Sequence, residues 1–189
     1  ARKRTRTAAA ASSSASAIVL SGGHAHPPRT IAKCRSGALC DVELRAADGT
    51  AFRAHSLVLM ATSDYFEGLL SGDWADTSQP VALGEVSAPS LSACLDFIYT
   101  GECTVEDDSA LLAVLEAAAY LQIPTLVDSA ADAIKQRLGP ASVLQVWDAA
   151  DRQNLAALSA DAEKAVRKHF GAIASSPVWL GVPLERVRA

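Results

Sequence analysis

The hydrophobic pattern changes its period within one central stretch, residues 40–70. Val42 and Leu44 alternate with polar neighbours, which is typical of a half-buried β-strand. The Asp48-Gly49 pair that follows is a strong signal for a tight hairpin turn, and a short return strand is predicted directly after it. The stretch therefore begins as a β-hairpin.

After the return strand, the apolar positions follow a helical spacing. Leu57, Val58 and Met60 are predicted to form a buried helical turn, and Ser63 is predicted to cap a second helix over residues 64–70. A hairpin followed by two short helices is a compact supersecondary unit. We expect the remaining segments to pack against it.

The rest of the pattern is mostly helical, with short strands predicted at residues 80–83 and 102–105. The predicted helices run from Ser87 to Gly101, from Asp107 to Leu121, from Pro124 to Leu138, from Val143 onwards, and from Leu155 to Ile173 with Phe170 on its apolar face. Gly101 is expected to end the first of these in a left-handed conformation. The order of elements predicts the α+β class.

Composition supports a helix-rich fold with a sizeable core. Half of the 189 residues are hydrophobic, only 5% are aromatic, and alanine and leucine supply most of the apolar positions. This length predicts one domain plus part of another. The longest apolar runs are far too short to cross a bilayer, so we expect no membrane span.

Charge divides the chain into a basic start and an acidic body. Residues 1–40 contain seven basic and no acidic residues, whereas residues 41–189 contain ten basic and all twenty-one acidic residues. An acidic body argues against nucleic-acid binding by the folded part. Residues 1–30 are low in complexity and predict a disordered basic tail, which is compatible with a solvated extension, a nuclear localisation patch or an organelle transit peptide.

The chemistry-bearing residues do not form a catalytic or metal-binding pattern. The four cysteines, at positions 34, 40, 94 and 103, include no closely spaced pair, so we expect reduced thiols in an intracellular protein and no metal site. None of the common phosphate-binding, zinc-protease or nucleophile motifs is present. His55, the only histidine in a predicted core, is expected to be hydrogen-bonded and structural. We therefore expect no enzyme and no cofactor.

One tryptophan, Trp74, lies in a polar loop over residues 73–77. An exposed tryptophan forfeits about 2 kcal/mol of burial. Either it folds back onto the body, or it anchors a partner protein, because tryptophan is enriched at interface hot spots. The loop pattern leaves both interpretations open.

Several blocks of the central region resemble a BTB/POZ domain. These blocks are CDVEL, a DG turn, FRAHSLVL, SDYFEGLL, FIYTGE and LLAVLEAAAYLQIPTLVDSAADAI, all in the family's order and spacing. The resemblance implies a BTB/POZ domain over residues 31–138, with a short three-stranded sheet flanked by helices and helical hairpins. The signature positions in this chain are His55, Tyr65, Phe66, Tyr99 and Gly101.

The segment over residues 139–189 is similar to the opening of an all-helical BACK domain. A BTB domain followed by BACK resembles the Kelch-like substrate adaptors of cullin-3 ubiquitin ligases. The resemblance implies a homodimer that binds cullin-3 and captures a substrate protein through a region absent from this chain. The apolar cluster Trp179–Leu184 lies near the chain end, so we expect the natural protein to continue beyond Ala189.

The resemblance also assigns candidate binding residues. Cullin-binding members carry a hydrophobic-x-Glu motif in this loop, which corresponds here to Trp74 and Asp76, with an acid one methylene shorter. Asp41 and Leu39 correspond to the dimer interface. In many members, a basic residue at the position of Ser56 pairs with this aspartate and forms a charged pocket at the dimer interface. Ser56 cannot supply that charge, so the resemblance does not support use of this pocket to bind a corepressor.

These observations lead us to expect a non-enzymatic adaptor that promotes protein ubiquitination and degradation. The expected partners are a second copy of the chain, cullin-3 and a substrate protein, with no nucleic acid bound by the body and no membrane. We expect a cytoplasmic location, with nuclear entry and an organelle as alternatives. The alternative function is a dimerising scaffold of a transcription regulator.

Overall fold

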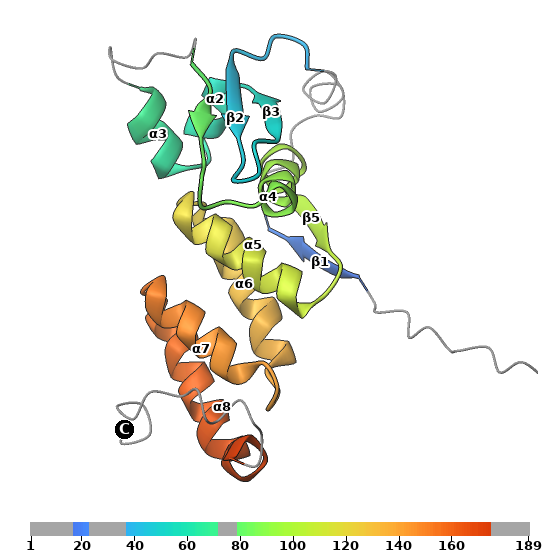
Figure 1. The fold of residues 1–189 in the computed structure, drawn as a ribbon, viewed down its shortest axis with the longest axis vertical. Coiled ribbons are helices and arrows are strands. Elements are labelled where there is room, and N and C mark those ends of the chain that lie inside the picture. Colours follow the sequence, from blue (N-terminus) through green and yellow to red (C-terminus); the bar gives the residue numbers. More distant parts are fainter. Residues whose placement is uncertain (1–16, 23–36, 72–78, 175–189) are drawn as a thin grey trace, which may run out of the picture.

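The computed structural model of this chain describes residues 17–22, 37–71 and 79–174 (Figure 1). Its elements are, in chain order, β1 (Ile18–Ser21), β2 (Val42–Arg45), β3 (Ala51–Ala54), α2 (Ser56–Met60), α3 (Asp64–Leu70), β4 (Val81–Ala82), α4 (Ala88–Thr100), β5 (Glu102–Val105), α5 (Asp108–Tyr120), α6 (Pro124–Arg137), α7 (Val143–Arg152) and α8 (Ala156–Ala174). This mixture of short strands and helices confirms the predicted α+β class.

Three strands form a sheet at the upper end of Figure 1, in the order β3–β2–β4. β2 and β3 are antiparallel, with Val42 opposite Ala54, whereas β4 runs parallel to β2. In the turn between β2 and β3, Gly49 has a φ of 85°, and Asp48 accepts a hydrogen bond from the Thr50 N–H at 2.9 Å. Glycine adopts a positive φ without steric cost because it has no Cβ. The predicted hairpin is confirmed.

A second sheet joins β1 to β5, two strands that are far apart in the sequence. Both inward side chains of β1 are buried, and the Ser129 hydroxyl of α6 donates to the Ser21 carbonyl oxygen at 3.0 Å. The prediction of a disordered tail over residues 1–30 is therefore wrong for Ile18–Ser21; most of that tail lies outside the described residues. A four-residue apolar run shows too little periodicity to identify a strand when its partner comes much later in the chain.

The helix ends follow local rules. Ser63, Ser87 and Asp107 each accept a hydrogen bond from the backbone N–H three residues later, as their positions before helices predict. Such a cap stabilises a helix by about 1 kcal/mol because it satisfies an otherwise unpaired donor. Gly101 ends α4 with a φ of 79°, the left-handed conformation expected of it.

The hydrophobic core runs from the three-stranded sheet through α4, α5 and α6. Its fully buried side chains include Leu44, Leu59, Phe66, Leu83, Leu91, Leu115 and Leu126. In the five-residue helix α2 the buried residue is Leu59, whereas Leu57 is 74% exposed. The prediction that Leu57 is buried is wrong, because so short a helix has room for only one fully inward side chain.

α7 and α8 pack together at the lower end of Figure 1, with α7 also touching α5 and α8 touching α6. The buried positions of α8 include Leu158, Ala162 and Val166, as the spacing predicts. Phe170 is an exception, with half of its side chain exposed. The helix departs from regular geometry at His169, with φ −106° and ψ 15°, and this kink changes the direction of the side chains that follow. In the described part of the chain, no helix is long and apolar enough to span a membrane.

Candidate interaction surface

The two residues predicted to bind a partner, Trp74 and Asp76, lie outside the described residues. They belong to the segment between α3 and β4. Their role therefore stays a prediction.

His55 lies at the junction of β3 and α2, where hydrogen bonds engage its backbone N–H and both ring nitrogens. Its backbone N–H donates to the Tyr99 hydroxyl at 3.1 Å, and its Nδ1 lies 2.9 Å from the same oxygen. Its Nε2 lies 2.8 Å from the Ala38 carbonyl oxygen. Because a carbonyl can only accept, a neutral His55 carries its proton on Nε2, and its Nδ1 accepts from the Tyr99 O–H. Both ring nitrogens are thus engaged within the fold, which gives His55 no free nitrogen for base catalysis.

Asp41 and Ser56, fifteen positions apart, are brought together directly beside His55. The Ser56 N–H donates to one oxygen of the Asp41 carboxylate at 2.8 Å, and the Ser56 hydroxyl donates to the other at 2.6 Å. Burial acts to raise the pKa of Asp41, but the hydrogen bonds from Ser56 outweigh it and hold the pKa below its usual value. A serine in this position therefore satisfies the carboxylate without a basic partner.

Two exposed leucines lie in the segments that these hydrogen bonds join. Leu39 is 90% exposed and has a φ of 62°, and Leu57 is 74% exposed. Leu39 was a predicted interface residue, whereas sequence reasoning missed Leu57 because it expected that side chain to be buried. These two exposed leucines lie next to Asp41 and Ser56, which are already hydrogen-bonded to each other. The leucines are therefore a candidate surface for association with another protein.

The other signature positions lie in the core. Phe66 is fully buried, and the ring of Tyr65 packs edge-on against it with centroids 5.3 Å apart and lies 5.4 Å from the ring of Tyr120. Burial, together with a hydrogen bond to Tyr120, raises the pKa of Tyr65 to about 12. Tyr65 therefore stays protonated at neutral pH.

The cysteines of the described residues form no disulfide. Burial, with a smaller contribution from Cys103, raises the pKa of Cys94 to about 12. Burial likewise raises the pKa of Cys103 to about 11. Only the thiolate is nucleophilic, so these two thiols are unreactive at neutral pH. The described residues also contain no group of three side chains suited to hold a metal ion.

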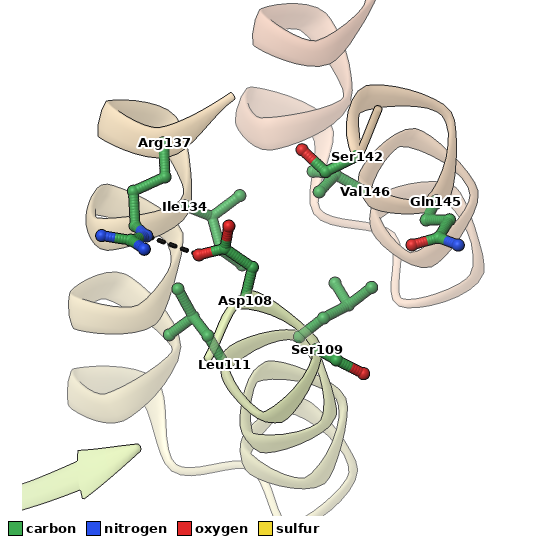
Figure 2. A pocket seen from close by; sticks show the side chains of 9 residues that line it. Asp108, Ser109, Leu111, Ile134, Arg137, Ser142, Gln145 and Val146 are labelled. Atoms are coloured by element: carbon green, nitrogen blue, oxygen red, sulfur yellow. Dashed lines mark hydrogen bonds and ion pairs between the residues drawn. The ribbon is translucent and has the colours of Figure 1, made fainter. Parts of the chain in front are cut away.

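A small cavity of about 70 Å³ lies where α5, α6 and α7 meet (Figure 2). Asp108 of α5 and Arg137 of α6 point toward one another there and form an ion pair, while Ser142 and Gln145 line the side nearest α7. This space suits a few water molecules rather than a substrate. The ion pair joins the start of α5 to the end of α6.

A larger depression of about 280 Å³ lies beside α3. Met60, Ile98 and Pro124 give it apolar walls, and Asp64 and Glu67 of α3 add two carboxylates. Sequence reasoning missed this surface because its residues come from three separate parts of the chain, residues 60–67, 97–98 and 123–125. Its carboxylates come from α3, the last described helix before the segment that contains Trp74.

Comparison with known proteins gives a family-level match. A family model for the BTB/POZ domain matches residues 32–138. The chain is 34% identical over 152 residues to Kelch-like protein 26 of Mus musculus and 33% identical over 148 residues to Kelch-like protein 21 of Homo sapiens. These matches cover 80% and 78% of this chain but 25% and 24% of the relatives, so the chain spans about a quarter of their length.

Among solved structures, the BTB domain of zebrafish PATZ1 is 28% identical, with a TM-score of 0.49. That match covers 56% of this chain and 84% of the other.

Proposed function

The chain belongs to the BTB/POZ domain family, and from this premise we propose that it is the adaptor part of a cullin-3 ubiquitin ligase. In this role the protein catalyses nothing itself. It holds a substrate beside the ligase and so raises the effective concentration of that substrate for ubiquitin transfer. The substrate-binding region is proposed to lie in a part of the protein beyond this chain.

The match to Kelch-like proteins supports the adaptor role. The aligned stretch of 152 residues is longer than the family match over residues 32–138, so it includes sequence outside the BTB domain. α7 and α8 follow that domain directly and pack onto α5 and α6, as the opening of a BACK domain would. The likeness to these relatives therefore extends beyond the BTB domain, which supports the proposal that α7 and α8 begin a BACK domain.

The proposed cullin site consists of Trp74, Asp76 and the depression beside α3. Trp74 supplies a large apolar anchor, and Asp76 accepts a hydrogen bond at a shorter reach than the family's glutamate. The depression adds apolar walls and the carboxylates of Asp64 and Glu67, which suit a partner surface with apolar and basic side chains. The presence of Trp74 in the polar sequence that follows α3 is the single observation on which this proposal depends.

Binding of the purified cullin-3 N-terminal domain, measured by calorimetry, tests the site. Trp74→Ala is expected to weaken binding by about 2–4 kcal/mol, the loss typical of a hot-spot tryptophan. Asp76→Glu is expected to strengthen binding, because it restores the longer acid of the family motif. Phe170→Ala is the matched control, since it removes an exposed aromatic ring from α8, at the far end of the molecule. Absent binding, or binding unchanged by Trp74→Ala, contradicts the proposal.

We also propose that the adaptor is a homodimer and that Leu39 and Leu57 lie at its interface. Both leucines are exposed, and burying them against a second copy would remove apolar surface from water. Light scattering is expected to give the mass of a dimer, and Leu57→Glu is expected to give a monomer. A monomeric parent protein, or a Phe170→Glu control that dissociates equally, contradicts this assignment.

A further inference from the structure

All three lysines of the described residues line one groove. Lys135 comes from α6, and Lys164 and Lys168 come from α8, one helical turn apart. The groove has a volume of about 310 Å³, and the apolar side chains of Leu138 and Ala165 also line it. We call it the lysine groove.

Two of these lysines have no neutralising partner in the described structure. Lys135 is paired with Asp161, its Nζ lying 3.1 Å from a carboxylate oxygen, and the pKa of Lys135 is raised by that contact. Lys164 and Lys168 form no ion pair with any described residue. Arg167, the other basic side chain of this segment, is paired with Glu163 within α8. The free positive charge of the groove therefore comes from Lys164 and Lys168.

The fold gives no reason for this charge. A helix dipole favours basic residues only in the last turn, which accounts for Lys135 in α6 but not for Lys164 near the middle of α8. Residues 41–189 carry twenty-one acidic and ten basic residues. The lysines of the groove therefore form a positive site in a part of the chain whose net charge is negative.

We propose that the lysine groove binds an acidic peptide segment of a partner protein. Lys164 and Lys168 are separated by about 6 Å along the helix axis. Alternate side chains of an extended peptide are separated by about 6.6 Å and lie on the same face. Two acidic residues with one residue between them therefore match the two free lysines, while the apolar lining contacts their methylene groups. This inference does not depend on cullin binding.

The charge of the body favours a peptide over other anions. A nucleic acid or an anionic membrane carries a dense array of phosphates and binds a wide basic face. Among the described residues, the lysines gather only in this groove, and the acidic body around it would repel such a large polyanion. A short acidic segment can enter the groove and stay clear of the rest of the surface.

Fluorescence anisotropy with the protein and a labelled peptide tests the proposal. The probe is a short peptide with glutamate at alternate positions, and its control has glutamine at those positions. The glutamate peptide is expected to bind and the glutamine peptide is not. Lys164→Glu and Lys168→Glu are each expected to weaken binding by about fivefold, the change for reversal of an exposed charge pair. Lys168→Gln is expected to give a smaller loss.

Arg53→Glu is the matched control, because it makes the same change of charge at an exposed position on β3, at the opposite end of the molecule. It is expected to leave peptide affinity within about twofold. Equal binding of the two peptides, or an equal loss in Arg53→Glu, overturns the proposal. Two further results would also overturn the proposal, because they assign the groove to another occupant. One is binding of an oligouridylate that is tighter than binding of the glutamate peptide. The other is self-association of the protein that is lost in Lys164→Glu.

Discussion

The two ends of this molecule use their polar side chains in opposite ways. At the junction of β3 and α2, Asp41 is hydrogen-bonded to Ser56, and His55 is hydrogen-bonded to Tyr99 and to the Ala38 carbonyl oxygen. At the end formed by α6 and α8, Lys164 has no such partner among the described residues. Polar groups that bond within the fold help to specify it, whereas those left without partners are available to another molecule.

The burial of aromatic rings also differs between the two ends. Phe66 in α3 is fully buried in the core, whereas Phe170 in α8 is half exposed beyond the kink at His169. If the first end carries the stability of the fold and the second carries a binding surface, matched substitutions at the two ends should differ strongly.

The largest expected difference is between Phe66→Ala and Phe170→Ala. Removing the buried ring should lower the free energy of unfolding by about 3–5 kcal/mol, through lost burial and the cavity left behind. Removing the half-exposed ring should lower it by less than about 1 kcal/mol. Urea denaturation measures both, with an unchanged denaturant slope as the check that unfolding stays two-state. Similar losses for the two variants would contradict the comparison.

A smaller loss is expected from Tyr99→Phe. The phenylalanine ring fits the same space but leaves the His55 N–H and Nδ1 without their hydrogen-bond partner. An unsatisfied group in a largely buried site should lower the free energy of unfolding by about 1–3 kcal/mol. If Tyr99→Phe has the same unfolding midpoints in temperature and in urea as the parent protein, the hydrogen bonds to His55 do not stabilise the fold.

The smallest expected effect concerns the acid dependence of stability. The pKa of Asp41 is lower in the folded protein than its usual value of 3.8, so its carboxylate stabilises the fold above that value. This contribution should be lost as the pH falls below about 4 and through the lowered folded pKa. Because Asp41 is largely exposed, the loss should stay below about 1 kcal/mol.

Ser56→Ala removes one of the hydrogen bonds that lower the pKa of Asp41. The variant should therefore lose less stability than the parent protein between pH 6 and pH 3, as measured by urea unfolding at both pH values. An acid-induced loss equal to that of the parent protein would mean that the hydroxyl contributes nothing to the effect.

Much of the fold was predictable because its signals are local. The Asp48-Gly49 turn, the Ser63, Ser87 and Asp107 caps and the left-handed Gly101 each depend on a few neighbouring residues. Local hydrogen bonding and backbone sterics are the same in a short segment as in the whole protein. The matched family blocks likewise lie in the order that the sequence presents.

Other features depend on parts of the chain that meet only after folding. β1 is a strand because β5, much later in the chain, pairs with it, and the depression beside α3 gathers residues from three separate segments. Leu57 is exposed because the core has room for Leu59 alone in a helix of five residues.

The sequence by itself determined the family, the class of fold and the central unit of a hairpin followed by two short helices, since these follow from residue spacing and local conformation. Only the tertiary structure decided which polar groups would have partners. It joined Ser56 to Asp41, and it placed Lys135 of α6 beside the two lysines of α8. The physical reason is that hydrogen bonds and ion pairs depend on distances of a few ångströms in space, which the spacing of residues along the chain does not contain.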